Sequence, residues 1–269
     1  MKTNSELITL SNNIRKKILD SLYYGGSGHA GSSMSIVEIL TVLYFDKLNI
    51  ENPNNKDRLI LSKGHAVPAL YATLAEYGLI EEKELKTLRK IGSRLQGHPD
   101  RRMLDCLDAG TGALGQGLSI AIGYAIANKL LKKNRDVYCI LGDGEIQEGQ
   151  IWEAAMYASV NIGSELTCII DHNKLQNETW VSDTLDLGDI EKKWNSFGWK
   201  VSVIDGHDIE QIKEAFSSEK KTDKPHVVIA KTIKGKGISF MENNNEWHGK
   251  VLNLEFYEQA KKELKENNN

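Results

Sequence analysis

Short apolar runs alternate with stretches of helical periodicity along most of the chain. The runs are rich in β-branched and aliphatic residues, which is typical of buried strands. They lie at 58–61, 137–141, 166–170, 200–204 and 226–230, and helical stretches lie at about 67–77, 114–131, 150–159, 190–197 and 209–216. Strands that alternate with helices indicate βαβ units. The sequence therefore predicts an α/β fold, a parallel sheet with helices on both faces.

The N-terminal part is mostly helical by the same criteria. Polar spacing predicts helices over 5–23 and 35–48, with a glycine-rich turn between them, and a charged surface helix over 81–90. The stretch 114–131 is apolar almost all round and rich in Gly and Ala, so burial on most sides is expected, with another helix approaching closely. No linker or internal repeat interrupts the pattern, and a single domain over 1–269 is expected.

Charge and composition remove several classes of function. The chain has 34 Lys and Arg against 37 Asp and Glu, a net charge of −3, which gives no electrostatic basis for binding nucleic acid or an anionic membrane. No segment approaches the roughly 18 apolar residues of a membrane span, and the polar N-terminus does not resemble a signal peptide. A cytoplasmic location is expected. Three cysteines without CxxC spacing, Cys106, Cys139 and Cys168, fit structural positions.

Chemistry is expected in the loops that follow the strands, because open α/β sheets bind ligands at the carboxyl ends of their strands. Asp143 stands between Gly142 and Gly144 after one strand, and Asn173 follows the next. A carboxylate, an amide oxygen and a nearby carbonyl suit Mg²⁺, and the glycines let backbone N–H groups approach a phosphate. This pattern indicates a magnesium–diphosphate site. An ordinary turn with a capping Asp143 and a turn-forming Asn173 explains the same residues.

A second glycine pattern competes with this interpretation. Residues 110–115 fit GxGxxG, and Asp136 follows 21 residues after Gly115, as in a dinucleotide-binding fingerprint. That fingerprint has to follow a buried strand, whereas 101–109 is polar and mixed. We therefore interpret the pattern as a turn into a closely packed helix. No GxxxxGK[ST] motif is present.

Four histidines, His29, His65, His98 and His248, lie in glycine-containing loops. An imidazole with an ordinary pKa near 6.5 serves as a general acid or base or binds polar substrates. Taken singly, each is equally explained as a surface or capping residue, and none has the pair spacing of a zinc site. The remaining histidines, expected at strand ends or in solvent, are His172, His207 and His226.

Taken together, seven motifs in order resemble the N-terminal half of transketolase. They are Gly28-His29-Ala30-Gly31, Ser62-Lys63-Gly64-His65, Gly97-His98-Pro99-Asp100, 111–117, Gly142-Asp143-Gly144 with Glu148, Asn173-Lys174-Leu175, and 234–237 leading to Trp247-His248-Gly249. The resemblance implies the thiamine diphosphate-binding fold of a PP-type domain. The length is similar to that of the smaller subunit of split bacterial transketolases.

The resemblance also implies roles for individual residues. Asp143 and Asn173 match side-chain ligands of Mg²⁺, and Leu175 matches a carbonyl ligand. The residues implied in thiamine diphosphate binding are His65, Gly112, Leu114, Gly142, Asp143, Gly144, Glu148, Asn173 and His248. Those implied in catalysis are His29, His65, His98 and His248. Glu148 and Glu153 match acidic residues at the subunit interface of the family.

At the level of function, the resemblance implies a two-chain transketolase. Such an enzyme moves a two-carbon ketol unit from a ketose, or its phosphate, to an aldose, or its phosphate. Its pyrimidine-binding domain is expected on a C-terminal partner chain, so this chain is expected to be inactive on its own. With its partner it is expected to form a heterotetramer. Ala30 and Ala113 stand where the family often has proline. Because alanine does not restrict φ as proline does, both loops are expected to be less rigid here. Two alternatives remain: a subunit of a 2-oxo acid decarboxylating enzyme, and a non-catalytic assembly homologue.

Overall fold

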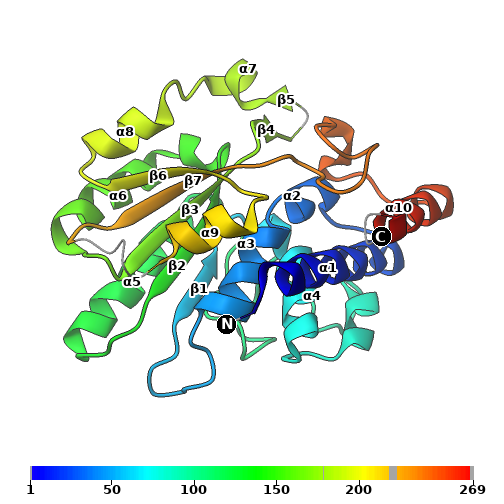
Figure 1. The fold of residues 1–269 in the computed structure, drawn as a ribbon, viewed down its shortest axis with the longest axis horizontal. Helices are drawn as coiled ribbons and strands as arrows, with labels where there is room; N and C mark the ends of the chain where they lie inside the picture. Colours follow the sequence, from blue (N-terminus) through cyan, green and yellow to red (C-terminus); the bar gives the residue numbers. More distant parts are fainter. Residues whose placement is uncertain (1, 178, 218–222, 267–269) are drawn as a thin grey trace.

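A computed structural model describes residues 2–177, 179–217 and 223–266. Within those ranges, no helix is both long enough and apolar enough to cross a membrane. The molecule is built around one central sheet with a layer of helices on each side (Figure 1). The predicted α/β architecture is confirmed.

Five parallel strands form the sheet in the spatial order β1-β2-β3-β7-β6. Their bounds are β1 Arg58–Leu61, β2 Val137–Gly142, β3 Leu166–His172, β6 Lys200–Asp205 and β7 His226–Lys231. Each was predicted to within a residue or two at its ends. Because the strands are parallel, the loops after β1, β2, β3 and β7 meet along one edge of the sheet.

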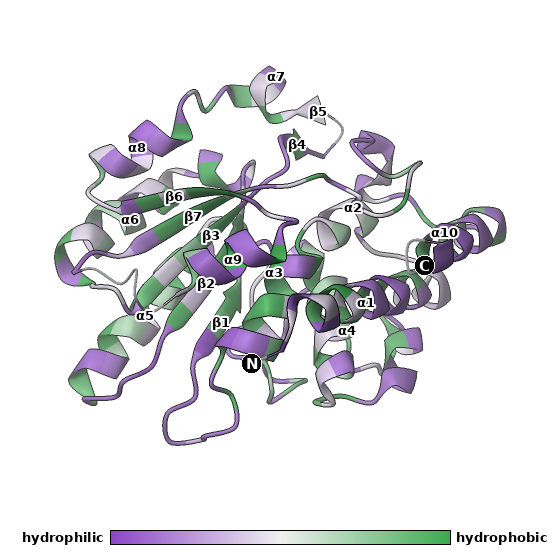
Figure 2. Cartoon of the chain, in the orientation of Figure 1, coloured by the Kyte–Doolittle hydropathy of each residue, from purple (hydrophilic) through white to green (hydrophobic). Residues whose placement is uncertain are grey.

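The helices divide between two faces and bury two separate apolar clusters. On one face lie α1 (Asn4–Gly25), α2 (Ala30–Met34), α3 (Val37–Val42), α4 (Val67–Tyr77) and α9 (Ile209–Ala215), and α10 (Leu254–Glu266) packs on α1. On the other lie α5 (Gln116–Leu130), α6 (Gly149–Asn161) and α8 (Ile190–Ser196). The strands, largely apolar in Figure 2, contribute alternate residues to the two clusters and therefore require cover on each side.

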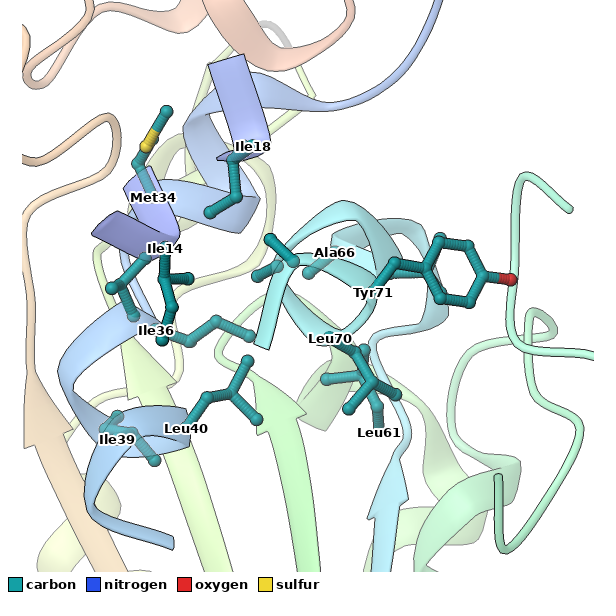
Figure 3. Close-up of a cluster of buried hydrophobic side chains, with 14 of the residues drawn as sticks. Ile14, Ile18, Met34, Ile36, Ile39, Leu40, Leu61, Ala66, Leu70 and Tyr71 are labelled. Carbon is teal, nitrogen blue, oxygen red and sulfur yellow. The ribbon is translucent and has the colours of Figure 1, made fainter. Parts of the chain in front are cut away.

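Helix α1 is specified locally at both ends. Thr3 and Glu6 form a capping box at its start, and Gly26 closes it in the left-handed conformation with φ 68°. Its apolar face, which includes Ile14 and Ile18, packs against α3 and α4 (Figure 3). This packing fixes the helices whose N-terminal ends border the candidate site.

Several predicted helices differ in detail. The helix predicted over 35–48 is α3, which begins at Val37 and ends in a π-helical turn, Leu43–Lys47. Helix α2 lies just before it, in a part of the chain for which no helix was predicted, and Ser35 separates the two by directing its hydroxyl to Ser32 O and to Asp171. The helix predicted over 81–90 is a 3₁₀ helix, Glu82–Thr87, and the left-handed φ of 59° at Arg89 prevents its continuation. Elements that the sequence analysis did not identify are β4 (Leu175–Gln176), β5 (Thr179–Trp180), α7 (Val181–Leu185) and α10.

The expectation that 114–131 is buried on most sides is wrong for one face of α5. Leu118, Ala121 and Ala125 pack on the sheet, whereas Gly123 and Leu130 are exposed. The neighbouring α6 exposes Met156, Tyr157 and Val160. Apolar residues therefore lie on every side of α5, but the described part of this chain packs against only one side.

Two glycines of α5 test this packing. A Cβ atom at Gly117 would lie 2.3 Å from Ser62 Cβ and 2.7 Å from Ser62 Cα, whereas nothing lies within 4 Å of one at Gly123. Because the Ser62 backbone cannot yield without moving β1, Gly117→Ala is expected to lower the free energy of unfolding by about 1–3 kcal/mol. Gly123→Ala, the matched control, is expected to raise it by about 0.5–1 kcal/mol. Urea unfolding measures the free energy of unfolding of both variants. Equal changes in that free energy for Gly117→Ala and Gly123→Ala would contradict the packing of α5 on β1.

Candidate active site

A pocket of about 390 Å³ opens where the loops after β1, β2 and β3 meet α2 and the segment around His248. Every residue that the sequence analysis named as catalytic, cofactor-binding or metal-ligating lines it: His29, His65, His98, Gly112, Leu114, Gly142, Asp143, Gly144, Glu148, Asn173, Leu175 and His248. The fold thus brings together residues from loops that are far apart in the sequence. Their individual roles stay predictions.

Three oxygen donors lie in one corner of the pocket. Asp143, 2% exposed, accepts hydrogen bonds from the N–H groups of Gly144 (2.8 Å) and Lys174. Asn173 Oδ1 accepts from the Leu175 N–H group at 3.1 Å. One carboxylate, one amide and the Leu175 carbonyl form an oxygen set that suits a hard divalent cation sharing its shell with phosphate and water. No cluster of three or more His, Cys, Asp or Glu side chains in the described ranges has the arrangement of a metal site.

Asp171 lies fully buried beneath this corner. Its carboxylate accepts hydrogen bonds from Lys63, Ser35 (2.7 Å), Asn173 Nδ2 (2.8 Å) and Thr232. Burial alone would raise the pKa of Asp171, but the Lys63 ammonium and the hydrogen bonds from Lys63, Thr232 and Ser35 together outweigh burial, and the pKa is lowered. The bond from Asn173 Nδ2 fixes the orientation of that amide, so Oδ1 is the atom left to accept on the opposite side.

Lys234 is a second buried cation at the same place. Its side chain is fully buried, and its Nζ contacts the Leu175 carbonyl at 3.3 Å and His248 Nδ1 at 3.0 Å. Within the described part of the chain it forms no ion pair with a carboxylate, in contrast to Lys63. Burial and the nearby Lys63 lower the pKa of Lys234 to about 8. The carboxylates of Asp143 and Asp171 oppose this shift from a distance, but neither contacts the ammonium directly. A buried ammonium without a direct ion pair is costly, so an anion bound beside Leu175 and His248 would compensate it.

Three imidazoles of the pocket contact one another edge-on or tilted. The ring centroids of His29, His65 and His248 lie 5.1–5.5 Å from one another. Burial, followed by neighbouring positive charge, lowers the pKa of His29 to about 4 and that of His248 to about 3. The pKa values of His65 and His98 are also lowered, mainly by burial. These rings are therefore uncharged near neutral pH, the form that both donates and accepts hydrogen bonds.

Glu145 connects the strand end to the glycine loop. Its carboxylate accepts hydrogen bonds from Ser62 and from the N–H groups of Gly115 (2.9 Å) and Gly142 (3.0 Å), while burial raises its pKa.

The 110–115 segment enters α5 without a preceding strand, so the dinucleotide interpretation is wrong. At Gly112, φ is 154° and an added Cβ would lie 3.2 Å from His98 Cγ, so glycine permits the close approach of this loop to the ring.

Several polar residues of this region were not singled out from the sequence: Lys63, Arg89, Glu145, Asp171 and Lys234. Arg89 contributes to the lowered pKa values of His29 and His98, which places a cation near both rings. Lys63 and Lys234 each precede a glycine in a motif, the one signal that was available. Asp171 stands at the carboxyl end of an apolar strand, where ligands are expected, but its place in the sequence indicated no particular role.

Comparison with known proteins agrees with this geometry. The sequence profile of the family described as "Transketolase, thiamine diphosphate binding domain" matches residues 8–269. A 6-deoxy-6-sulfo-D-fructose transketolase subunit from Clostridium sp. (strain MSTE9) is 42% identical over 259 residues, which cover 94% of each chain. An apulose-4-phosphate transketolase subunit from Phocaeicola vulgatus is 39% identical, with 94% of this chain and 91% of that protein covered.

Solved structures give the same result. Transketolase from Campylobacter jejuni superposes with a TM-score of 0.89 at 32% identity, over 98% of this chain and 43% of that one. The chain thus spans about two fifths of the length of that transketolase and of the human enzyme, of which it covers 41% at 40% identity. The profile match and these identities extend over nearly the whole chain. The chain therefore belongs to the transketolase family, with the sequence and fold of its thiamine diphosphate binding domain.

Proposed function

We propose that this chain is the diphosphate-binding subunit of a two-chain transketolase. In this proposal it acts with a C-terminal, pyrimidine-binding subunit to transfer a two-carbon ketol unit from a ketose or ketose phosphate to an aldose or aldose phosphate. The observation that carries the proposal is the buried Lys234 ammonium, which lacks a carboxylate partner in the described structure and adjoins both the oxygen donors and the uncharged histidines. We also propose that the protein acts in the cytoplasm.

The donor set fits thiamine diphosphate bound through Mg²⁺. Asp143, Asn173 and the Leu175 carbonyl would hold the metal, and diphosphate oxygens and water would complete its six-oxygen shell. Lys234, His65 and His248 would face the diphosphate, and Gly112 and Leu114 would border the aminopyrimidine. When bound, thiamine diphosphate supplies the electron sink that ketol transfer requires.

The histidines would act on the sugar. Because burial keeps His29, His65 and His248 uncharged near neutral pH, each ring is able to take a proton from a hydroxyl group and return it. His98, from a neighbouring loop, would bind a hydroxyl group of the same substrate. Decarboxylation of an apolar 2-oxo acid needs fewer such groups, and the relatives compared above are named as transketolases, which favours ketol transfer.

The partner chain is proposed to cover the exposed face of α5 and α6. That face presents Leu130, Met156 and Val160, which are 78%, 52% and 82% exposed. Glu148, exposed at the pocket rim, and Glu153 on α6 match interface residues of the family. Two relatives of nearly the same length are named as transketolase subunits, which supports a separate partner chain. A single domain here and a heterotetrameric assembly are part of the proposal.

Asp143→Ala tests the cofactor site. Loss of the carboxylate ligand is expected to weaken magnesium-dependent binding of thiamine diphosphate by at least about 10-fold, since losing even an outer partner of a metal ligand costs about 10–100-fold. Isothermal titration of the cofactor into the chain, with and without a candidate pyrimidine-binding subunit, measures the effect. Asp105→Ala, at an exposed position outside the pocket, is the control and is expected to bind as the wild type does.

Unchanged binding by Asp143→Ala would contradict the site. No binding by the wild-type chain, even with its partner and Mg²⁺, would instead favour the non-catalytic homologue. Thermal unfolding of each variant, recorded alongside, separates loss of a ligand from loss of the fold.

The double variant Met156→Glu/Val160→Glu tests the partner face. Two carboxylates placed in an apolar contact are expected to weaken association with the partner chain by more than about 10-fold, because a few buried apolar residues dominate such interfaces. Analytical ultracentrifugation of the mixed chains measures association. Ile8→Glu, which introduces a charge at a 53% exposed position of α1 on the opposite face of the sheet, is expected to assemble normally. Equal assembly of both variants would place the partner elsewhere.

A further inference from the structure

His207 lies outside the pocket, on the loop that joins β6 to α9 and so close to a strand end, one of the two positions expected for it. Its side chain is 12% exposed. The Ile233 N–H group donates to its Nε2 at 2.8 Å, and its Nδ1 lies 3.0 Å from Glu38 Oε2. A backbone amide is a donor, so Nε2 is the acceptor, and Nδ1 carries the hydrogen and donates to Glu38. Both bonds therefore require one tautomer of an uncharged ring.

Glu38 links this ring to α1. Its other carboxylate oxygen lies 2.6 Å from Arg15 Nη2, and Arg15 Nε donates to the Lys236 carbonyl at 3.0 Å. Although burial favours a higher value, Arg15 and His207 lower the pKa of Glu38 to about 2, so the carboxylate is ionised. The loop that follows β7 is thus held at Ile233 by His207 and at Lys236 by Arg15, with Glu38 joining the two.

Lys234 lies between these two attachment points. Its backbone is also fixed by the Gly235 N–H group, which donates to Gly31 O at 3.0 Å, and by the Asn243 N–H group, which donates to Lys234 O at 2.9 Å. Its side chain lies tightly against Gly31, where an added Cβ would be 2.9 Å from Lys234 Cγ. With so little free space, the place of the ammonium beside Leu175 O and His248 depends on the position of the loop backbone.

We propose that His207 is a positioning residue that, held by Glu38 and Arg15, places Lys234 against the diphosphate-binding wall of the pocket. The inference rests on the proposed function, because it assigns the anion at that wall to a diphosphate. His207 touches neither the oxygen donors nor the pocket, so it acts through the loop. Its loss leaves the Ile233 N–H group without its acceptor and releases one end of the loop.

Inorganic diphosphate with Mg²⁺, titrated into the full chain, tests the proposal directly. His207→Leu is expected to raise the Kd by about 10-fold, as is usual when an outer partner of a binding group is lost. His207→Gln, whose amide is able both to accept from Ile233 and to donate to Glu38, is expected to restore most of the affinity. Ile212→Val, a core change on the adjacent α9 that does not touch the loop, is the control and leaves the Kd unchanged. A wild-type Kd for His207→Leu overturns the proposal.

A double-mutant cycle separates positioning from general destabilisation. If His207 acts through Lys234, then His207→Leu adds nothing to the Kd increase caused by Lys234→Met; additive effects overturn the proposal. Two-bond ¹H–¹⁵N spectra of the wild-type chain give a reading that needs no variant to fold: hydrogen on Nδ1 of His207 is expected, and hydrogen on Nε2 contradicts the arrangement. A wild-type chain that binds neither diphosphate nor thiamine diphosphate overturns the proposed function itself, whereas normal binding with an unaffected His207→Leu overturns this inference alone.

Discussion

Two lysine ammonium groups buried at the carboxyl edge of the sheet set the main electrostatic constraint on this structure. Lys63 is neutralised by Asp171, whereas Lys234 faces a carbonyl and an imidazole. Asp143 and Asp171 attract the Lys234 ammonium only from a distance, and a buried cation without a direct ion pair costs up to several kcal/mol, on the order of the whole stability of a domain. The surrounding fold has to hold that charge in place, and the proposed diphosphate is what would neutralise it.

The parallel sheet and its two helix layers supply the rigidity that this arrangement needs. Asp171 lies at the end of β3, between β2 and β7, so one carboxylate contacts residues from segments far apart in the sequence. The Arg15–Glu38–His207 network holds the next loop from the helical side. In contrast, the outer face of α5 and α6 is left apolar and exposed. The loop that carries Lys234 is thus held from one helix layer, and the partner chain is proposed to cover the other layer.

The sequence was sufficient for what depends on local pattern. Strand periodicity and the placement of Asp143, His65 and His98 in glycine loops led to the five strands and to the pocket. Contacts between segments that are far apart in the sequence could not be predicted from local pattern. Lys63 and Asp171 are 108 residues apart, and Glu38 and His207 are 169 residues apart. Burial of α5 was overestimated because an apolar helix surface does not reveal whether its cover belongs to the same chain. Helix α2 was missed as well, and the bond from the Ser35 hydroxyl at its C-terminal end goes to a side chain 136 residues away.

The central claim, that this chain is one half of a ketol-transferring enzyme, is tested most directly by a transfer assay with the chain and a candidate pyrimidine-binding subunit. Ketose phosphate donors and aldose phosphate acceptors are supplied with Mg²⁺ and thiamine diphosphate, and the new ketose is measured by mass spectrometry. The account predicts transfer of a two-carbon unit when both chains are present and none with either chain alone. Turnover of pyruvate without any ketol transfer, by a pair of chains that binds the cofactor, would contradict it.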